Sequence, residues 1–411
     1  MIAFTAFFVV ALGSIWFWAR GAERRIVAFG LLLRLALLPI VIQLSIPVSG
    51  TRSITPSAES DDVSYYRTAA SIYDAQSFDG AADEFAILVN PGFFYLLGAF
   101  FLVFGKLWFI PHALNLLAGI ALPVAVVRLA RVLGVDRAGA ERAGWITAVL
   151  PTLAFFSLTG YKDMFTIFVA TMSIYSIARL YRSGWSSGGA LQVLFWTGCT
   201  MVFRLGLVPL VGAAFGLVAM RRLRARGVLL LILVAGVSFP PAFSWWQAAA
   251  LTDYFSLMEI LSQSGTESGM AAQVLQGGVA TWPLRALVFL LLPYPSLTEL
   301  GSAWDLYTWL NLSWYLALAM AIPGACLLWS RARERGSELG LLPLAFVAVV
   351  LFSLMIRGMP NMRYILSIAP LVAIMASTAL GRRDTAMAGI TLIVVGASAA
   401  IPGYFLLRIS L

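Results

Sequence analysis

Long runs of apolar residues, broken by short clusters of arginine, dominate this chain. The clearest uncharged or nearly uncharged runs cover residues 2–19, 26–48, 107–127, 143–160, 339–356, 364–380 and 385–407. Weaker or interrupted runs cover 164–181, 189–205, 207–220, 227–246 and 307–329. Because a helix needs roughly 20 apolar residues to cross a bilayer, the pattern predicts about twelve transmembrane helices. We therefore predict an all-α polytopic membrane protein, with residues 1–411 forming one integral membrane domain.

Composition supports this fold class and narrows the function. The chain of 411 residues is 61% hydrophobic and 11% charged. Soluble domains carry roughly a quarter charged residues, so a soluble enzyme and a nucleic-acid-binding domain are both excluded. A secreted disulfide scaffold and a disordered chain are excluded too. We expect membrane lipids around the protein and no nucleic acid among its partners.

The distribution of arginine predicts the orientation of the helices. The formal net charge is +9, and most of the 28 Lys and Arg residues gather in short connections after apolar runs. Cytoplasmic loops of membrane proteins carry this excess of positive charge. The clusters assigned to the cytoplasm lie at residues 20–25, 128–142, 179–182, 221–226, 331–335 and 382–383.

This orientation holds only if residues 90–105 do not cross the membrane. That run has sixteen residues, which is short for a crossing, and counting it as a span would invert every later loop. We predict an amphipathic helix lying in the outer interface. Two long outer segments then emerge, 49–106 and 247–306. Long segments of this kind in a compact protein are often functional.

The first outer segment contains the most promising acidic cluster. Asp61 and Asp62 precede a helix-like stretch at 63–76. Burial and a neighbouring like charge raise the pKa of a carboxyl group, and a general base needs a pKa near the working pH. The alternative is structural, because either aspartate can simply cap the helix that follows.

A second acidic position lies in the predicted outer turn around 159–163. Asp163 follows Lys162 there, on the same side of the membrane as Asp61. Local pairing with Lys162, or capping of the helix that starts at Met164, is the alternative interpretation.

Three arginines on the outer side run against the usual charge distribution. Arg357 and Arg363 flank a short outer connection, and Arg204 lies near the outer end of its own span. A guanidinium group binds phosphate through two parallel hydrogen bonds, so an anionic phosphate is a suitable partner. The alternative is a side chain that extends towards lipid headgroups.

Two further polar residues fall inside predicted spans. Arg34 lies within the second apolar run, where a charge is costly and usually faces protein. It can pair with an acid or extend inward. His112 is the single histidine, and we interpret it as a packing residue.

The order of these pieces resembles the GT-C superfamily of membrane glycosyltransferases. It is most similar to the bacterial branch related to protein O-mannosyltransferases and the lipid A aminoarabinose transferase. The segments that carry the resemblance are DDVSY at 61–65, NPGFFYLL at 90–97, RLARVLG at 128–134, the hairpin 151–163 and RYILSIAPL at 363–371.

The resemblance implies an inverting glycosyltransferase. Its donor would be a sugar on a polyprenyl-phosphate carrier, and its acceptor a glycan, lipid or protein. It further implies the bacterial inner (plasma) membrane, with the active site on the extracytoplasmic face. Asp61 would be the base, with Asp62 second, and Asp163 would orient the base or the acceptor.

The rest of the implied site binds substrate. Arg357 and Arg363 would stabilise the leaving phosphate, and Arg204 would add a weaker contact. Tyr65, Lys162 and Tyr364 complete the predicted set. Some superfamily members use a divalent metal and others none. The acidic pair has no clear third ligand, so we expect no cofactor.

Two alternatives remain open from the sequence. An oligosaccharide polymerase or ligase would also use lipid-linked sugars, but with catalysis by arginine or histidine. A transporter or flippase for a lipid-linked solute would place ionisable groups near the middle of the bilayer. Here most outer acids and cations fall in loops, with Arg34 as the exception.

Overall fold

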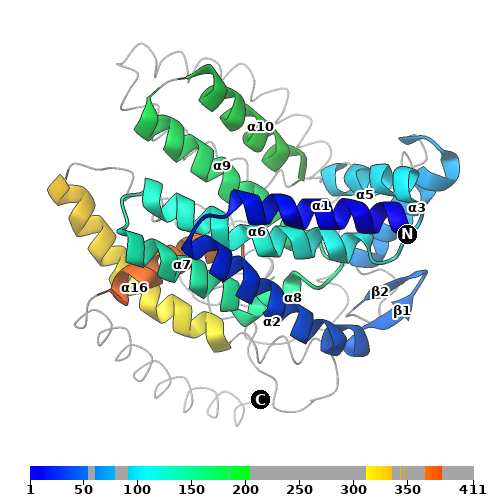
Figure 1. Ribbon diagram of the computed structural model, residues 1–411, viewed down its shortest axis with the longest axis horizontal. Coiled ribbons are helices and arrows are strands. Elements are labelled where there is room, and N and C mark those ends of the chain that lie inside the picture. Colours follow the sequence, from blue (N-terminus) through cyan, green and yellow to red (C-terminus); the bar gives the residue numbers. More distant parts are fainter. Residues whose placement is uncertain are drawn as a thin grey trace, which may run out of the picture.

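The computed structural model describes residues 1–53, 61–78, 91–184, 186–203, 312–335, 343, 347 and 366–381. Labels follow Figure 1. In chain order the elements are α1 (Ile2–Trp18), α2 (Ala22–Leu44), β1 (Ile46–Val48), β2 (Thr51–Ser53), α3 (Asp61–Ala75), α5 (Pro91–Phe104), α6 (Ile110–Val132), α7 (Arg137–Val149), α8 (Pro151–Phe156), α9 (Asp163–Ser183), α10 (Ser187–Phe203), α16 (Leu312–Arg335), the 3₁₀ turn η5 (Leu366–Ile368) and α19 (Ala369–Ala379).

Most of the predicted spans within the described residues are helices. The runs 2–19, 26–48, 107–127, 164–181, 189–205 and 307–329 correspond to α1, α2, α6, α9, α10 and α16, and the run 364–380 contains η5 and α19. Four helices of the described part are long and apolar enough to cross a membrane: α2, α6, α9 and residues 313–331 of α16. The protein is therefore an integral membrane protein. Of the remaining predicted spans, 207–220, 227–246 and 385–407 lie outside the described residues, as does 339–356 apart from residues 343 and 347.

The run 143–160 is not one helix, as the sequence predicts, but two. Helix α7 ends at Val149, and α8 begins at Pro151 after Leu150, whose ψ of 111° leaves the helical region. Proline has no amide hydrogen to continue the hydrogen-bond ladder, and it disfavours helical backbone at the residue before it. This break leaves main-chain carbonyls at the end of α7 without intrahelical donors.

Arg34 of α2 binds one of those carbonyls from inside the bundle. Its side chain is fully buried. Its Nη1 donates to the carbonyls of Gly30 and Ala148, at 3.0 and 3.3 Å, and its Nε donates to Ser157 Oγ at 2.8 Å. The buried arginine thus neither points out of the membrane nor joins an acid in these contacts. It ties α2 to both sides of the break.

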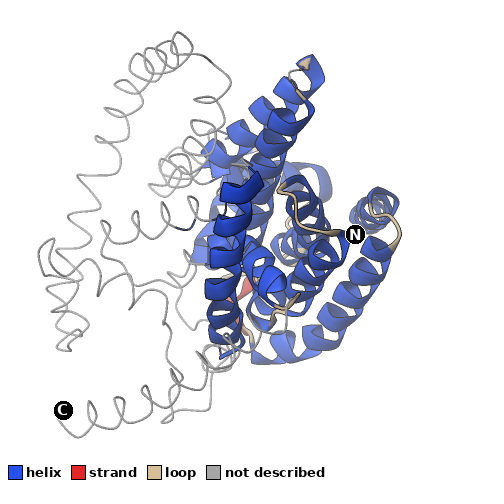
Figure 2. Cartoon of the chain, turned by 90° about the vertical axis from the view of Figure 1, so that its left-hand side faces the viewer, coloured by secondary structure: helices blue, strands red, loops and turns tan. Residues whose placement is uncertain are grey.

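Strand β1 occupies the end of the predicted span 26–48, and β2 lies at the start of the first outer segment, so the all-α expectation is incomplete. Strands β1 and β2 pair antiparallel, with Ile46 opposite Ser53. Their two-residue turn, Ser49–Gly50, has positive φ at both positions, which matches the twist of a hairpin. Figure 2 shows this hairpin in red beside described elements that are otherwise helical.

The predicted short helix at 90–105 is confirmed as a helix. Helix α5 has 14 residues and packs against α3. Rings from α1, α5 and the start of α6 surround Phe4, including those of Phe100, Phe104 and Phe109 at 5.4–6.5 Å between centroids. The hairpin, α3 and α5 therefore lie at the end of the bundle where the chain begins (Figure 1).

Helix α6 runs through the centre of the described bundle. It packs against α2, α7 and α9, and almost every residue from Leu114 to Ala130 is buried. Pro123 lies inside this helix without ending it. Ile110 near the start of α6 shares an apolar cluster with Tyr65 of α3, whereas Arg128 and Arg131 near its end contact Trp18 and Glu23 on either side of the α1–α2 connection.

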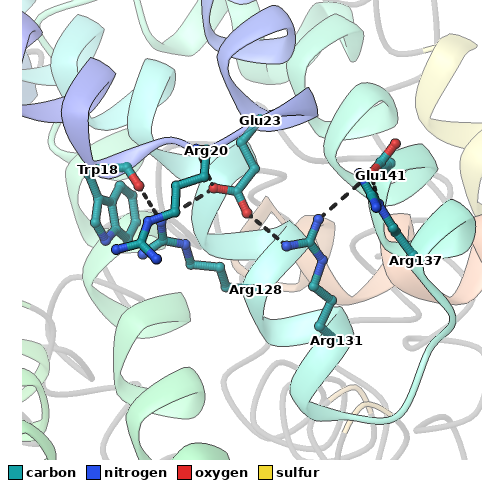
Figure 3. A network of polar contacts seen from close by, with 7 residues as sticks. All are labelled: Trp18, Arg20, Glu23, Arg128, Arg131, Arg137 and Glu141. Carbon is teal, nitrogen blue, oxygen red and sulfur yellow. Dashed lines mark hydrogen bonds and ion pairs between the residues drawn. The ribbon is translucent and has the colours of Figure 1, made fainter.

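An ionic network joins the helices at that second end (Figure 3). The buried carboxylate of Glu23 accepts from Arg128 and Arg131 of α6, at 3.3 and 3.2 Å, and from the main-chain amide of Arg20. The Arg128 guanidinium lies 4.3 Å from the centre of the Trp18 ring. Glu141 of α7 joins the network through Arg131 and the exposed Arg137.

We predict that Glu23→Gln destabilises the protein by about 2 kcal/mol, because two arginines lose the carboxylate between them. The matched variant Glu141→Gln should cost less than about 1 kcal/mol, because its partner Arg137 is mostly exposed. Thermal unfolding in detergent micelles measures both. Equal melting temperatures for the two variants would show that the network does not hold the helices together.

Candidate active site

The predicted acidic positions come together at the end of the bundle that holds the hairpin. Four pieces of chain meet there: β2, the start of α3, the start of α6, and residues 157–162 between α8 and α9, here called the 157–162 turn. Each of the first two predicted acids is in the first turn of α3, and Asp163 is the first residue of α9. A carboxylate at a helix N-terminus is stabilised by the helix dipole.

Asp62 is held between the hairpin and the 157–162 turn. Only 2% of its surface is exposed. Its Oδ1 accepts from the hydroxyl of Ser53, at 3.0 Å, and from the amide of Val63. A β-carbon at position 160 would lie 3.2 Å from the Asp62 Cβ. Glycine at position 160 thus lets Asp62 pack directly on the turn.

Asp61 has a different environment from its neighbour. It is exposed, and the hydroxyl of Tyr65 donates to its Oδ2 over a long 3.5 Å. Tyr65 itself is buried and packs edge-on against Phe93 and Phe94 of α5. The two adjacent carboxylates therefore differ, with one fixed and covered and the other open.

Lys162 brings a positive charge to the same place. Its Nζ lies 5.1 Å from the centre of the Tyr65 ring, one turn along α3 from Asp61. This contact and that of Gly160 with Asp62 show that the 157–162 turn packs on the start of α3. A cation above an aromatic ring is favoured by the ring's electron density.

Two side chains of α6 bind main-chain groups of the 157–162 turn. Nδ1 of His112 is 2.9 Å from the carbonyl of Leu158. Asn115 is fully buried, and its amide donates to the carbonyls of Thr159 and Tyr161 and accepts from the amide of Phe165 at 3.2 Å. Asp163, which is also fully buried, follows directly from this bonded stretch.

A metal site is not formed by the residues described. Among them, no group of three or more His, Cys, Asp and Glu side chains is arranged to hold a metal ion. The expectation that the protein works without a cofactor stays a prediction.

The site contains some of the predicted residues and others that the sequence did not predict. The structure groups Asp61, Asp62, Tyr65, Lys162 and Asp163 at one end of the bundle. The predicted residues Arg204, Arg357, Arg363 and Tyr364, and the second outer segment 247–306, lie outside the described residues.

Ser53, His112 and Asn115 make contacts that were not predicted from the sequence. The interpretation of His112 as a packing residue is incomplete, because its ring also binds the turn. Asn115 could have been found from the sequence, because it is an isolated amide in an apolar run. It lies three positions from His112, on the same helical face.

The described fold is that of a helical membrane protein, and solved structures of similar fold are known. The fold resembles that of the archaeal oligosaccharyltransferase AglB from Archaeoglobus fulgidus, solved with an inhibitory peptide and a dolichol-phosphate. The TM-score is 0.51 at 12% identity, and the match covers 93% of this chain and 52% of AglB. The apo form of the Archaeoglobus fulgidus enzyme gives 0.49 at 13% identity, covering 94% and 55%.

These similarities concern the fold. This chain spans about half the length of the AglB chain that it matches. No family model matches the sequence, and no curated protein matches it either.

We predict that Gly160→Ala destabilises the protein by about 1–2 kcal/mol, because the new methyl group overpacks against Asp62. The φ angle of Gly160 is not positive, so the cost would come from space and not from backbone strain. The control is Gly198→Ala in α10, where a β-carbon meets nothing within 4 Å. Alanine there should be neutral or stabilising by up to about 1 kcal/mol. A melting temperature for Gly160→Ala at or above that of Gly198→Ala would contradict the close packing.

Proposed function

We propose that this protein is an inverting glycosyltransferase that moves a sugar from a polyprenyl-phosphate carrier to an acceptor on the extracytoplasmic side of the membrane. The observation that carries the proposal is the packing of the acidic start of α3 against the turn that ends in Lys162 and Asp163. It puts acids and a cation side by side at one end of a membrane bundle.

The two aspartates of α3 divide the work in this proposal. Asp61 is the better base, because its carboxylate is exposed and its hydrogen bond from the Tyr65 hydroxyl is long, at 3.5 Å. Oδ1 of Asp62 is committed to Ser53 and Val63, so Asp62 serves mainly to lock the hairpin onto α3. Asp163, at the start of α9, orients the acceptor or the base.

The reaction is a single displacement at the anomeric carbon of the sugar. The acceptor oxygen forms a bond to that carbon while the bond to the carrier phosphate breaks on the opposite face. The acceptor proton passes to Asp61, and the phosphate leaves as an anion on its polyprenyl chain. Placed positive charge lowers the energy of that anion in the transition state.

Positive groups for the leaving phosphate come from two sources. Lys162 lies beside Tyr65, and the α9 N-terminus adds the positive end of its dipole. Arg357 and Arg363, with weaker support from Arg204 and Tyr364, are proposed from the sequence to complete the phosphate contact.

The fold supports a lipid-linked donor. The AglB structure of similar fold was solved with a dolichol-phosphate, which is itself a polyprenyl-type phosphate. The exposed apolar surfaces of α1 and α2, with Val10, Phe17 and Leu32 among their residues, match a lipid environment.

The charge asymmetry of α6 supports the extracytoplasmic side. His112 and Asn115 belong to the site, whereas Arg128 and Arg131 belong to the ionic network at the other end of the same helix. Because arginine concentrates on the cytoplasmic side, the site would face the opposite side.

We predict that Asp61→Asn lowers the rate of sugar transfer by roughly 100-fold or more, because a general base contributes at least that much. Asp62→Asn should also lower it, through loss of the anchored hairpin. The control is Asp74→Asn in the same helix, since Asp74 is exposed and paired with Lys106 at 2.7 Å. That hydrogen bond raises the pKa of Lys106, so Asp74 is engaged away from the site.

The assay uses purified protein with a panel of sugars, single and oligomeric, on polyprenyl phosphate, and measures release of free polyprenyl phosphate. Wild-type rates in both Asp61→Asn and Asp62→Asn would eliminate the proposed base.

We predict opposite labelling of cysteines placed at the two ends of the bundle. Asp74 and Arg137 are both exposed, and Cys199 and Cys326, the free cysteines of the described part, would be replaced by alanine. In intact cells a membrane-impermeant maleimide should label Asp74→Cys and spare Arg137→Cys. The reverse pattern would place the site on the cytoplasmic side.

A further inference from the structure

We infer that His112 and Asn115 of α6 are positioning residues that set the place of Lys162 and Asp163 by binding the main chain of the 157–162 turn. The inference rests on the proposed function for its effect on sugar transfer. The placement itself is independent of any substrate.

The turn has main-chain groups that need partners inside protein. Its residues Ser157, Thr159 and Tyr161 are each at most 3% exposed. The turn belongs to neither α8 nor α9, so its carbonyls are not all bonded within a helix. A buried carbonyl without a hydrogen bond is strongly unfavourable, so whatever binds these carbonyls fixes the path of the chain.

Two side chains, those of His112 and Asn115, bind three of these carbonyls. Asn115 uses its amide nitrogen for the carbonyls of Thr159 and Tyr161 and its amide oxygen for the amide of Phe165. These three contacts bracket Lys162 and Asp163 along the chain. Asparagine is one of the few side chains that can donate twice and accept at once.

His112 adds the contact nearest the start of the turn. It lies one helical turn before Asn115 on the same face of α6, and its Nδ1 is 2.9 Å from the Leu158 carbonyl. Because a carbonyl only accepts, Nδ1 carries the proton in this contact. Trp108 packs edge-on against the ring, at 5.6 Å between centroids, and fixes its plane.

The same ring reaches towards the acidic pair. A β-carbon at position 160 would lie 3.6 Å from Nε2 of His112 and 3.2 Å from the Asp62 Cβ. His112 therefore lies on the side of Gly160 that faces Asp62. The α6 pair thus sets both the position of the turn and its contact with α3.

A disulfide measures the placement without any substrate. The test uses a chain in which Cys199 and Cys326 are replaced by alanine and Asp62 and Gly160 by cysteine. The two Cβ atoms would lie about 3.2 Å apart, close to the separation found in disulfides. Mild oxidation should join the two thiols rapidly. Adding Asn115→Asp should slow this reaction by roughly tenfold, because a carboxylate cannot donate to the two carbonyls.

Thr147→Val is the matched control for the cross-link. It removes a buried hydroxyl whose bond, to the Ala143 carbonyl, stays within its own helix α7. We expect the wild-type rate of disulfide formation in that variant. A rate unchanged by Asn115→Asp, or lowered as much by Thr147→Val, would overturn the inference.

Rescue by shape separates the hydrogen bond of His112 from its packing. His112→Asn places an amide nitrogen where Nδ1 stands and keeps the bond to Leu158, whereas His112→Phe keeps the ring beside Trp108 and loses the bond. With sugar transfer as readout, we expect His112→Asn to retain most of kcat and His112→Phe to lose roughly tenfold in kcat at similar KM for the donor. Equal rates in the two variants would show that packing alone matters. The cross-link still tests the placement if none of the donors is a substrate, so the inference and the proposed function can fail separately.

Discussion

The rest of the structure depends on one constraint, which is that main-chain polar groups inside an apolar bundle must be bonded. A continuous helix meets it by itself, but the chain breaks at Leu150 and turns again over 157–162. Both stretches are buried, so side chains must replace the missing helical bonds. Arg34 binds the carbonyl of Ala148 at the first break, and His112 and Asn115 bind carbonyls at the second. The irregular backbone that carries the site exists because these three side chains, from α2 and α6, bind it.

The same constraint explains why α6 packs so closely on the segment where α7 ends and α8 begins. A β-carbon at Gly119 would lie 2.4 Å from the Ser157 Cβ and 3.1 Å from the Arg34 Nε, so only glycine lets α6, α2 and the end of α8 meet there. A larger residue would push Ser157 away from Arg34 and move the turn that follows. Packing in the middle of the bundle and geometry at the site therefore depend on each other, because one face of α6 contacts both.

Apolar periodicity predicted the helices well because each run must match the thickness of the bilayer, whatever its neighbours do. Proline illustrates the limit of that reasoning, since Pro123 stays inside α6 while Pro151 begins a new helix. At the break before Pro151 the Ala148 carbonyl is bound by Arg34, which lies 114 positions earlier in the chain, so apolar runs alone do not reveal that contact. The β1–β2 hairpin was not predicted, because apolar and polar residues do not alternate along its eight residues. The role of Ser53 depends on its contact with Asp62, which the sequence does not show. The acids were found because charge is rare in this chain, whereas Asn115 is a neutral amide in an apolar run.

Adjacent carboxylates with unlike surroundings are a common way to give one residue chemistry and the other architecture. Asp62 is covered and bonded, which fixes the start of α3 against both the hairpin and Gly160. Asp61 then emerges from a rigid first turn, beside the Tyr65 ring on which Lys162 rests. If neither carboxylate were buried and bonded as Asp62 is, the start of α3 would lose its hydrogen bond to the hairpin and its contact with Gly160. Catalytic geometry needs to be held within a fraction of an ångström. In the proposed mechanism a buried acid, a glycine and a bonded turn would supply that support for the exposed acid.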